Sequence, residues 1–258
     1  MRPSFSTSLG SLAVLVVFLA AWQWGPGALG MPEFVLPKFS RVVQETGRMW
    51  SDSELLKHFS ITALEVVVGF VLGSALGMLF GVVLGLSPKT ESILSPYILA
   101  LQIAPKVAFA PLFVMWLGYT VYPKILVAVL IVFFPVMINV LSAVRTVDPD
   151  MVNLVRTLNA GRTQIFRLVE FPSAMPALFS GLRIAATLSV IGVTVGELVG
   201  GNLGLGYLLV DAEGQGNTAA VFVAIVGLTL IGILAYGAVV WAERRLLHYI
   251  PRAQVTTV

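Results

Sequence analysis

Six long apolar segments constrain the fold of this chain more than any other feature. They are roughly Leu9–Trp24, Ile61–Leu86, Ile93–Tyr119, Ile125–Val144, Ala177–Val199 and Ala219–Trp241. A helix needs about 20 predominantly apolar residues to cross a bilayer. Charged residues make up 11% of the chain, whereas a soluble domain carries about 25%. We therefore expect an all-α integral membrane protein with about six transmembrane helices.

The first apolar segment has two interpretations. It follows Arg2, and Ala20-Ala21 resembles the small-residue cleavage site of a signal peptide. We favour a retained span, because removal would leave five spans and place the new N-terminus outside.

The placement of Lys and Arg predicts the orientation, since cytoplasmic loops carry an excess of both. With the N-terminus inside, the inner side holds Arg2, Lys89, Arg145, Arg156, Arg162, Arg167, Arg183, Arg244, Arg245 and Arg252. The outer side holds Lys38, Arg41, Arg48, Lys57 and Lys124, of which the first four are balanced by Glu33, Glu45, Asp52 and Glu54. We expect cytoplasmic N- and C-termini, an external segment over 25–60, and an interfacial helix over Ser51–Phe59.

A basic stretch, Arg145–Pro176, separates the fourth and fifth apolar segments. Asp148 is a good N-cap and Pro149 suits the first helical position. Asn159, Ala160 and Gly161 should break this helix, and a second short helix should end before Pro172. Two short basic helices between spans indicate a docking platform on the cytoplasmic side; a solvated connecting loop is the simpler alternative.

Span two carries a stripe of glycines at every fourth residue: Gly69, Gly73, Gly77, Gly81 and Gly85. Small residues at this spacing allow close helix packing. Four residues turn a helix by about 400°, so the stripe drifts around it. We expect it to pack against more than one neighbour or against a crossing helix.

Span three contains Pro96, Pro105 and Pro111, with Lys106 near its middle. Such breaks persist at membrane depth where the backbone is buried in protein or lines a cavity. A mid-bilayer charge costs about 2.5–3.5 kcal/mol on insertion scales, so Lys106 should face a polar interior. A structural pairing of Lys106 is the alternative.

Span five carries Arg183 near its inner end and Glu197 near its outer end, about 21 Å apart along a helix. They cannot pair with each other, so each needs another partner. The glycine-rich sequence after Glu197 indicates a turn, and also allows a loop that opens and closes.

The sequence excludes several classes of protein. It has no cysteine, and His58 and His248 make no metal-ligand spacing, so we expect no metal site. The net charge of +3 reflects loop placement rather than nucleic-acid binding. There is no phosphate-binding GxxxxGK[ST] loop, since Lys89-Thr90 follows Pro88. No clustered His, Asp and Ser supports an enzyme.

Four blocks together resemble the permease subunit of a type I ATP-binding-cassette (ABC) importer, in the branch of nitrate, sulfonate and taurine permeases. They are Thr62 to Phe70; APKVAFAPLFVMWLGY at 104–119; Phe134-Pro135 followed by the basic stretch; and GELVGGNLGLGYLL at 196–209. The resemblance covers about Thr62 to Trp241. It implies an N-terminal helix and external segment over 1–57, a type 1 transmembrane domain over 58–242, and a cytoplasmic tail over 243–258.

The basic stretch aligns with that family's cytoplasmic EAA loop, whose coupling helices dock on the ATPase. The usual Glu-Ala-Ala is Asn153-Leu154-Val155 here, and the usual glycine is Asn159. The resemblance implies ATPase-coupling residues, which are Asn153, Arg156, Asn159, Ala160, Gly161 and Arg162. For the translocation pathway we single out Lys106, Met115 and Glu197.

The resemblance also implies partners: a second permease copy, two cytoplasmic ATPases that bind ATP and Mg²⁺, and an external solute-binding protein, all at a bacterial inner membrane. This chain should bind no cofactor itself. Expected solutes are nitrate, sulfonates, taurine, aromatic carboxylates, or thiamine- and riboflavin-related heterocycles. At Glu65 the first block resembles the permeases for heterocycles. The rival interpretation is a stand-alone channel or ion-coupled carrier that uses Glu197 and Lys106 as a charge relay.

Overall fold

The computed structural model describes residues 5–248, and that part of the chain contains helices and turns but no strand. This confirms the all-α prediction. Five helical segments are long and apolar enough to cross a membrane: Leu9–Ala28, Glu54–Gly85, Val121–Arg145, Arg162–Gly200 and Thr218–Leu246. The bent pair Pro88–Ile103 and Lys106–Leu117 brings the number to six if it is taken as one span.

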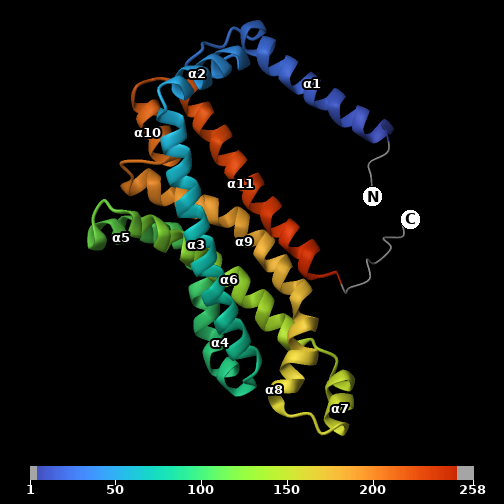
Figure 1. The fold of residues 1–258 in the computed structure, drawn as a ribbon. Coiled ribbons are helices and arrows are strands. Elements are labelled where there is room, and N and C mark those ends of the chain that lie inside the picture. Colours follow the sequence, from blue (N-terminus) through green and yellow to red (C-terminus); the bar gives the residue numbers. More distant parts are fainter. Residues whose placement is uncertain (1–4, 249–258) are drawn as a thin grey trace.

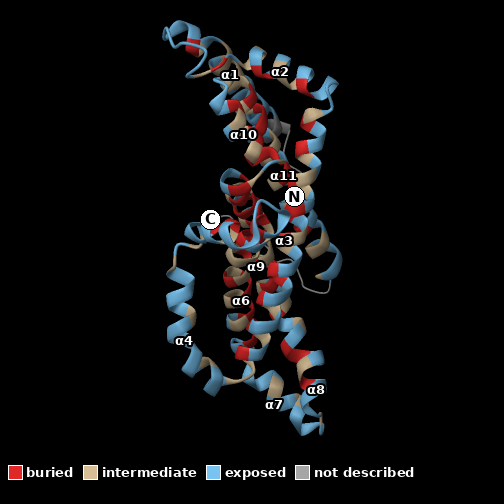
Figure 2. Ribbon diagram, turned by 90° about the vertical axis from the view of Figure 1, so that its left-hand side faces the viewer, coloured by how far each residue is buried: buried red, intermediate tan, exposed pale blue. Residues whose placement is uncertain are grey.

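Three long helices form the centre of the molecule: α3 (Glu54–Gly85), α6 (Val121–Arg145) and α9 (Phe171–Gly200). Helix α6 packs against both of the others, and buried residues concentrate along α6 and α9 (Figure 2). Its buried face repeats valine at every fourth residue from Val132 to Val144. This apolar ridge holds α3 and α9 in register.

The glycine stripe of α3 packs along this one ridge of α6. A Cβ on Gly69 would meet Ala128, one on Gly77 would lie 2.6 Å from the carbonyl of Phe133, and one on Gly85 would meet Val144. Of the two expected arrangements, packing against several neighbours is therefore wrong, and packing against one crossing helix is confirmed. Both helices repeat every four residues and run in the same direction, so they wind around each other in a right-handed sense and their stripes drift together.

The third apolar segment is broken rather than continuous. Helix α4 (Pro88–Ile103) ends before Pro105, and the short 3₁₀ helix η1 (Lys106–Phe109) and α5 (Ala110–Leu117) follow at an angle of 79°. Ala104 is extended (φ −53°, ψ 137°), which is the conformation favoured before proline. The single span predicted over Ile93–Tyr119 is thus two elements, with Lys106 at the break.

The basic stretch forms α7 (Pro149–Thr157) and α8 (Arg162–Ile165), as predicted, but α8 does not stop before Pro172. It continues through a π-helical turn, η2 (Phe166–Glu170), directly into α9. A proline in a helix lacks an N–H and crowds the preceding turn. The wider π turn immediately before Pro172 accommodates it. The expected second short helix is therefore the start of a 39-residue helix, Arg162–Gly200.

The other end of the molecule contains α2 (Phe39–Ser51), α10 (Leu205–Gly214) and the start of α11 (Thr218–Leu246), opposite α7 and α8 (Figure 1). The interfacial helix predicted over Ser51–Phe59 lies earlier, as α2, which buries Val42 and Met49. Ser53 has φ 58°, a left-handed conformation that separates α2 from α3.

Helix α1 (Phe5–Ala28) projects away from the bundle (Figure 1) and is held near its end. Trp22 Nε1 donates to the Pro37 carbonyl at 3.0 Å. At the other terminus α11 ends at Leu246, so the predicted tail begins inside this helix. The remainder of that tail, with Arg252, and also Arg2 lie outside the described residues.

Candidate functional site

Lys106 lies at the break between α4 and α5, against the middle of α6. Its Nζ donates to the Gln102 carbonyl at 2.6 Å and lies 4.7 Å from the ring centroid of Phe134. Phe134 is near the midpoint of α6, so the ammonium group sits at about half the depth of that helix. The sequence predicted this mid-span position correctly.

A cavity of about 400 Å³ adjoins Lys106. The break exposes the lysine to this space, which α6 and α9 complete. The lining residues are Gln102, Lys106, Ile131, Phe134, Pro135, Ile138, Asn139 and Leu188. The cavity thus combines one cation and two amide side chains with an apolar wall.

Met115 and Glu197, the other two predicted pathway residues, do not lie at this cavity. Met115 is on α5 and is 71% exposed. Glu197 is only 1% exposed, because α3, α9 and the start of α10 enclose it. The structure therefore does not bring the three residues together. Because the Glu197 side chain is buried away from the cavity, the prediction that it lines the pathway requires correction.

Glu197 instead holds the turn between α9 and α10 in place. Its Oε1 accepts from the Thr62 hydroxyl at 2.7 Å and its Oε2 accepts from the Gly206 N–H at 2.6 Å. Thr62 in turn accepts from the Leu205 N–H at 2.8 Å. Both carboxylate oxygens are used, so Glu197 acts as a positioning residue that ties α3 and α9 to α10.

The glycines after Glu197 are required by this close approach. Gly204 has φ 117°, and a Cβ there would overlap the Glu197 carboxylate. A Cβ on Gly206 would lie 2.8 Å from Glu197 Cβ. The glycine-rich sequence is a turn, as predicted, and it is wrapped around a buried carboxylate.

Three further buried polar residues, His58, Glu65 and Lys124, join Thr62 and Glu197 in a polar cluster, and sequence reasoning missed their role. The Gly204 N–H donates to His58 Nδ1 at 3.0 Å. Lys124 Nζ lies 2.9 Å from Glu65 Oε1 and donates to the Leu203 carbonyl at 3.0 Å. Lys124 was counted by its side of the membrane, without any expectation that it would be buried; it is 2% exposed. The signal available in the sequence was that Glu65 and Lys124, two residues of opposite charge, each lie in or next to a different apolar segment.

Arg183 finds its partner on α11, where its Nε lies 3.4 Å from Glu243 Oε2. This confirms that Arg183, near the middle of α9, and Glu197, near its C-terminal end, have separate partners.

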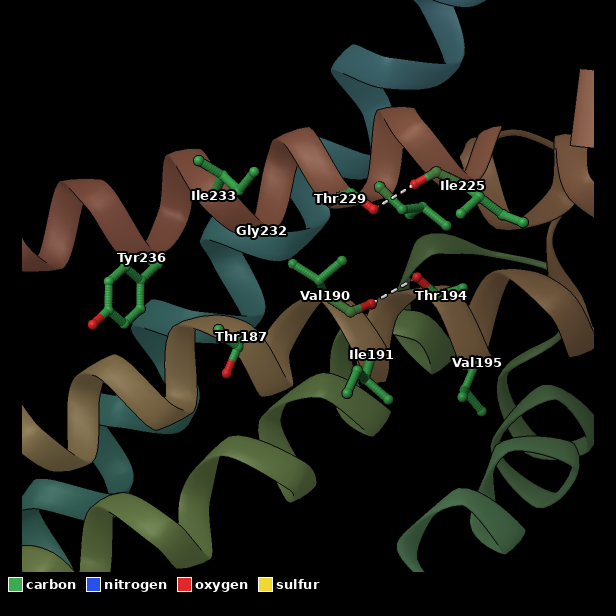
Figure 3. A pocket seen from close by; sticks show the side chains of 11 residues that line it. Thr187, Val190, Ile191, Thr194, Val195, Ile225, Thr229, Gly232, Ile233 and Tyr236 are labelled. Carbon is green, nitrogen blue, oxygen red and sulfur yellow. Dashed lines mark hydrogen bonds between the residues drawn. The ribbon is translucent and has the colours of Figure 1, made fainter. Parts of the chain in front are cut away.

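A second and larger cavity, of about 570 Å³, lies between α9 and α11 (Figure 3). Its threonines turn their hydroxyls back to their own helices: Thr194 donates to the Val190 carbonyl at 2.7 Å and Thr229 to the Ile225 carbonyl at 2.8 Å. No charged side chain lines it. This groove is therefore mainly apolar, and the Tyr236 hydroxyl is its one polar group besides the threonines.

The predicted coupling residues gather at the α7–α8 end. Asp148 caps α7 by accepting from the Asp150 N–H at 2.9 Å, as predicted. Asn159 has φ 60° and ends the helix, and the Gly161 N–H donates to Gln164 Oε1 at 2.8 Å to start the next. Arg162 Nη1 pairs with Glu170 Oε1 at 3.2 Å.

Helix α7 also presents an apolar stripe that the sequence analysis did not single out. Met151, Leu154 and Leu158 are exposed at helical spacing, and Leu154 is 65% exposed. Asn153 and Arg156 are exposed beside them. Residues three and four apart lie on one helix face. The stripe therefore forms a small, unpartnered apolar surface flanked by polar side chains.

Within residues 5–248 no cluster of three or more His, Asp and Glu side chains could hold a metal ion.

Comparisons with known proteins agree with this architecture. A family model described as "Binding-protein-dependent transport system inner membrane component" matches residues 73–248. The riboflavin transport system permease protein of Chloroflexus aurantiacus is 36% identical over 94% of this chain and 90% of its own. The putative aliphatic sulfonates transport permease protein of Bacillus subtilis is 33% identical over 92% and 86%, respectively.

A solved structure shares the fold. The permease chain in inward-facing conformations of the MetNI methionine ABC transporter aligns with a TM-score of 0.62 and 21% identity, over 80% of this chain and 99% of that chain.

Proposed function

The chain belongs to the binding-protein-dependent transport system inner membrane components, the permeases of ABC transporters, and from this premise we propose how it is coupled to ATP. A cytoplasmic ATPase docks on the α7–α8 loop, and its ATP-driven movement switches the permease between inward-open and outward-open states. ATP and Mg²⁺ are bound by that partner, and this chain contributes no catalytic residue.

The exposed stripe on α7 is the observation that carries this proposal. Met151, Leu154 and Leu158 expose apolar surface outside the membrane-spanning helices, which is costly unless a partner covers it. Asn153 and Arg156 form a polar rim, and Asn159 to Arg162 set the angle at which α7 is presented. An amphipathic helix that inserts into a groove uses anchors at this spacing.

The continuous helix from Arg162 to Gly200 supports a direct mechanical route. A displacement of α8 moves α9, because the π turn joins them without a loop. The outer end of α9 carries Glu197, which is bonded to Gly206 on α10 and to Thr62 on α3. Movement at the docking loop would thus reach the outer turn as a rigid-body rotation.

We also propose a second copy of the permease, two ATPases and an external solute-binding protein. Lys106 has no carboxylate partner among the described residues, so the face of α4, α6 and α9 that carries it is not suited to lipid. This supports a second permease copy on that face. The orientation with the α7–α8 loop and both termini inside follows from the distribution of Lys and Arg. The transmembrane domain would span about 58–242.

Site-directed cross-linking tests the docking proposal. The chain has no cysteine, so a single Leu154→Cys variant carries one reactive thiol. With the co-expressed ATPase, a thiol-to-amine cross-linker should join the two chains. Gln215→Cys, exposed at the opposite end in the turn after α10, is the matched control and should not cross-link. Equal cross-linking from both positions, or none from Leu154→Cys, would contradict the proposal.

For the solute we propose a small organic anion or a heterocycle. The similar proteins are named for riboflavin and for aliphatic sulfonates, so both chemistries occur among them. The rival carrier mechanism needs a relay between Lys106 and Glu197. In the described chain no hydrogen bond or ion pair joins them, and uptake that persists without the ATPase would be required to support it.

A further inference from the structure

We propose that the cavity at the α4–α5 break is a binding site for the negatively charged group of the transported solute. Lys106 supplies the charged contact and Asn139 a neutral polar contact. This inference rests on the proposed transport function and narrows its solute class to compact organic anions such as carboxylates and sulfonates.

The first argument is the missing counter-charge of Lys106. Lys124, a buried lysine near the start of α6, gives a comparison. Lys124 pairs with Glu65 at 2.9 Å. Lys106 has no carboxylate within 4.0 Å among residues 5–248, and its Nζ contacts the Gln102 carbonyl and the Phe134 ring. An ammonium group has three N–H donors, so two remain for a ligand.

The second argument is depth. Lys106 lies against the midpoint of α6, where a lysine facing lipid tails would be costly. It is too deep to be explained by an ordinary position at the membrane surface. The face made by α4, α6 and α9 must therefore adjoin water or protein, as expected of a pathway between two permease copies. A lipid head group does not reach this depth.

The third argument is the shape and chemistry of the space. Its volume of about 400 Å³ suits a small solute. Gln102 and Asn139 offer amide groups, and Asn139 uses only one N–H, which donates to the Pro135 carbonyl at 2.8 Å. Ile131, Phe134 and Leu188 provide an apolar wall. A charged head on Lys106 and an apolar body on this wall would be held together.

The apolar groove between α9 and α11 makes a useful contrast. It is larger, but no charged side chain lines it and its threonine hydroxyls are bonded to their own helices. An anion would leave its charge unpaired there. The position of Lys106 therefore distinguishes the two cavities.

The absence of cysteine allows a direct test in membranes that contain the full-length permease. Asn139→Cys introduces one thiol at the cavity wall. It is reacted with the anionic sulfonatoethyl and the cationic trimethylammonioethyl methanethiosulfonates, and both rates are normalised to those of a free thiol. A unit charge about 6 Å away through water favours the anionic over the cationic reagent by about tenfold.

The same preference is then measured after changing the lysine. We expect Lys106→Met to reduce the ratio of the anionic to the cationic rate to about one, and Lys106→Arg to preserve the original ratio. Benzoate should slow the reaction more than its neutral isostere benzamide at equal concentration. A thiol that does not react with either reagent, a preference unchanged by Lys106→Met, or equal effects of benzoate and benzamide would overturn the proposal.

This test is independent of ATPase docking, since it needs only the permease. A charge preference that depends on Lys106, together with no cross-linking at Leu154, would refute the proposed coupling and leave the anion site standing. Cross-linking at Leu154 without any charge preference would refute the anion site and leave the proposed coupling standing.

Discussion

Thr62 on α3 donates a hydrogen bond of 2.7 Å to Glu197 on α9, across 135 residues of sequence. The same hydroxyl accepts from the Leu205 N–H, and the same carboxylate accepts from the Gly206 N–H. Two side chains therefore satisfy the first backbone donors of α10, which would otherwise be unpaired at a helix start. This arrangement fixes the turn between α9 and α10 relative to the long helix that begins at Arg162.

Thr62→Val should weaken the fold, because it leaves Glu197 Oε1 and the Leu205 N–H buried without a partner. The expected loss is about 1–3 kcal/mol, measured as reduced thermal stability of the purified permease in detergent. Thr229→Val is the matched control, since that hydroxyl bonds only to its own helix at 2.8 Å. Similar losses in both variants would contradict the tertiary role of Thr62.

The buried pair of Lys124 and Glu65 should show strong coupling. Replacing one partner, by Lys124→Met or Glu65→Gln, leaves the other buried without its counter-charge and should cost about 3–5 kcal/mol. The double variant should lose much less than the sum of the single losses. A double-mutant cycle of thermal stabilities measures this coupling, and strictly additive losses would show that the pair does not interact.

Adding one methyl group to the glycine stripe should force α3 and α6 apart. A Cβ on Gly77 would lie 2.6 Å from the Phe133 carbonyl, and such overpacking costs about 1–3 kcal/mol. Gly237→Ala makes the same change in α11 with nothing within 4 Å. It should be neutral or slightly stabilising, because Ala favours a helix. Equal effects in unfolding experiments would refute the close packing.

The contact between α2 and α11 should weaken in acid. The hydrogen bond from the Arg48 guanidinium, helped by Asn217, lowers the pKa of Glu45 below its ordinary value. A carboxyl whose pKa is lower in the folded state stabilises that state fully above its unfolded pKa, and the contribution is lost as pH falls through the folded pKa. Thermal stability should therefore fall in that acidic range.

Glu45→Gln is the control for this pH dependence. It should remove the Glu45 contribution to the acidic fall while preserving an acceptor for Asn217, which donates to Glu45 Oε1 at 2.9 Å. An identical pH profile in the variant would assign the effect to other carboxyl groups.

The sequence predicted the elements of this fold better than their contacts. Runs of apolar residues identified the spans, and Asp148 and Asn159 identified the start and end of α7, because caps and breaks depend on local residues. The π turn before Pro172 was not predictable in the same way. It lies where α7 contacts both α8 and the turn itself, and the local proline signal does not contain these tertiary contacts.

The polar cluster around Glu197 could not be predicted without the tertiary structure, for a related reason. Glu65, Lys124 and His58 are separated by long apolar stretches, and their pairing depends on the register of α3, α6 and α9. The glycine stripe indicated close packing but not that one helix would cover all of it. Lys106 was identified because a charge in an apolar run is visible in sequence, whereas the cavity beside it arises only from the bend.

Association with the ATPase tests the central claim most directly, by co-purification of the tagged permease with the co-expressed ATPase subunit. Leu154→Asp places a charge on the apolar stripe. Gly161→Trp adds bulk where a Cβ would meet only Gln164 Oε1, at 3.8 Å, so the fold of the permease itself is spared. We predict that the unaltered permease retains the ATPase in detergent and that both variants, still folded, lose it. A folded permease that never retains the ATPase, or variants that retain it fully, would contradict the account.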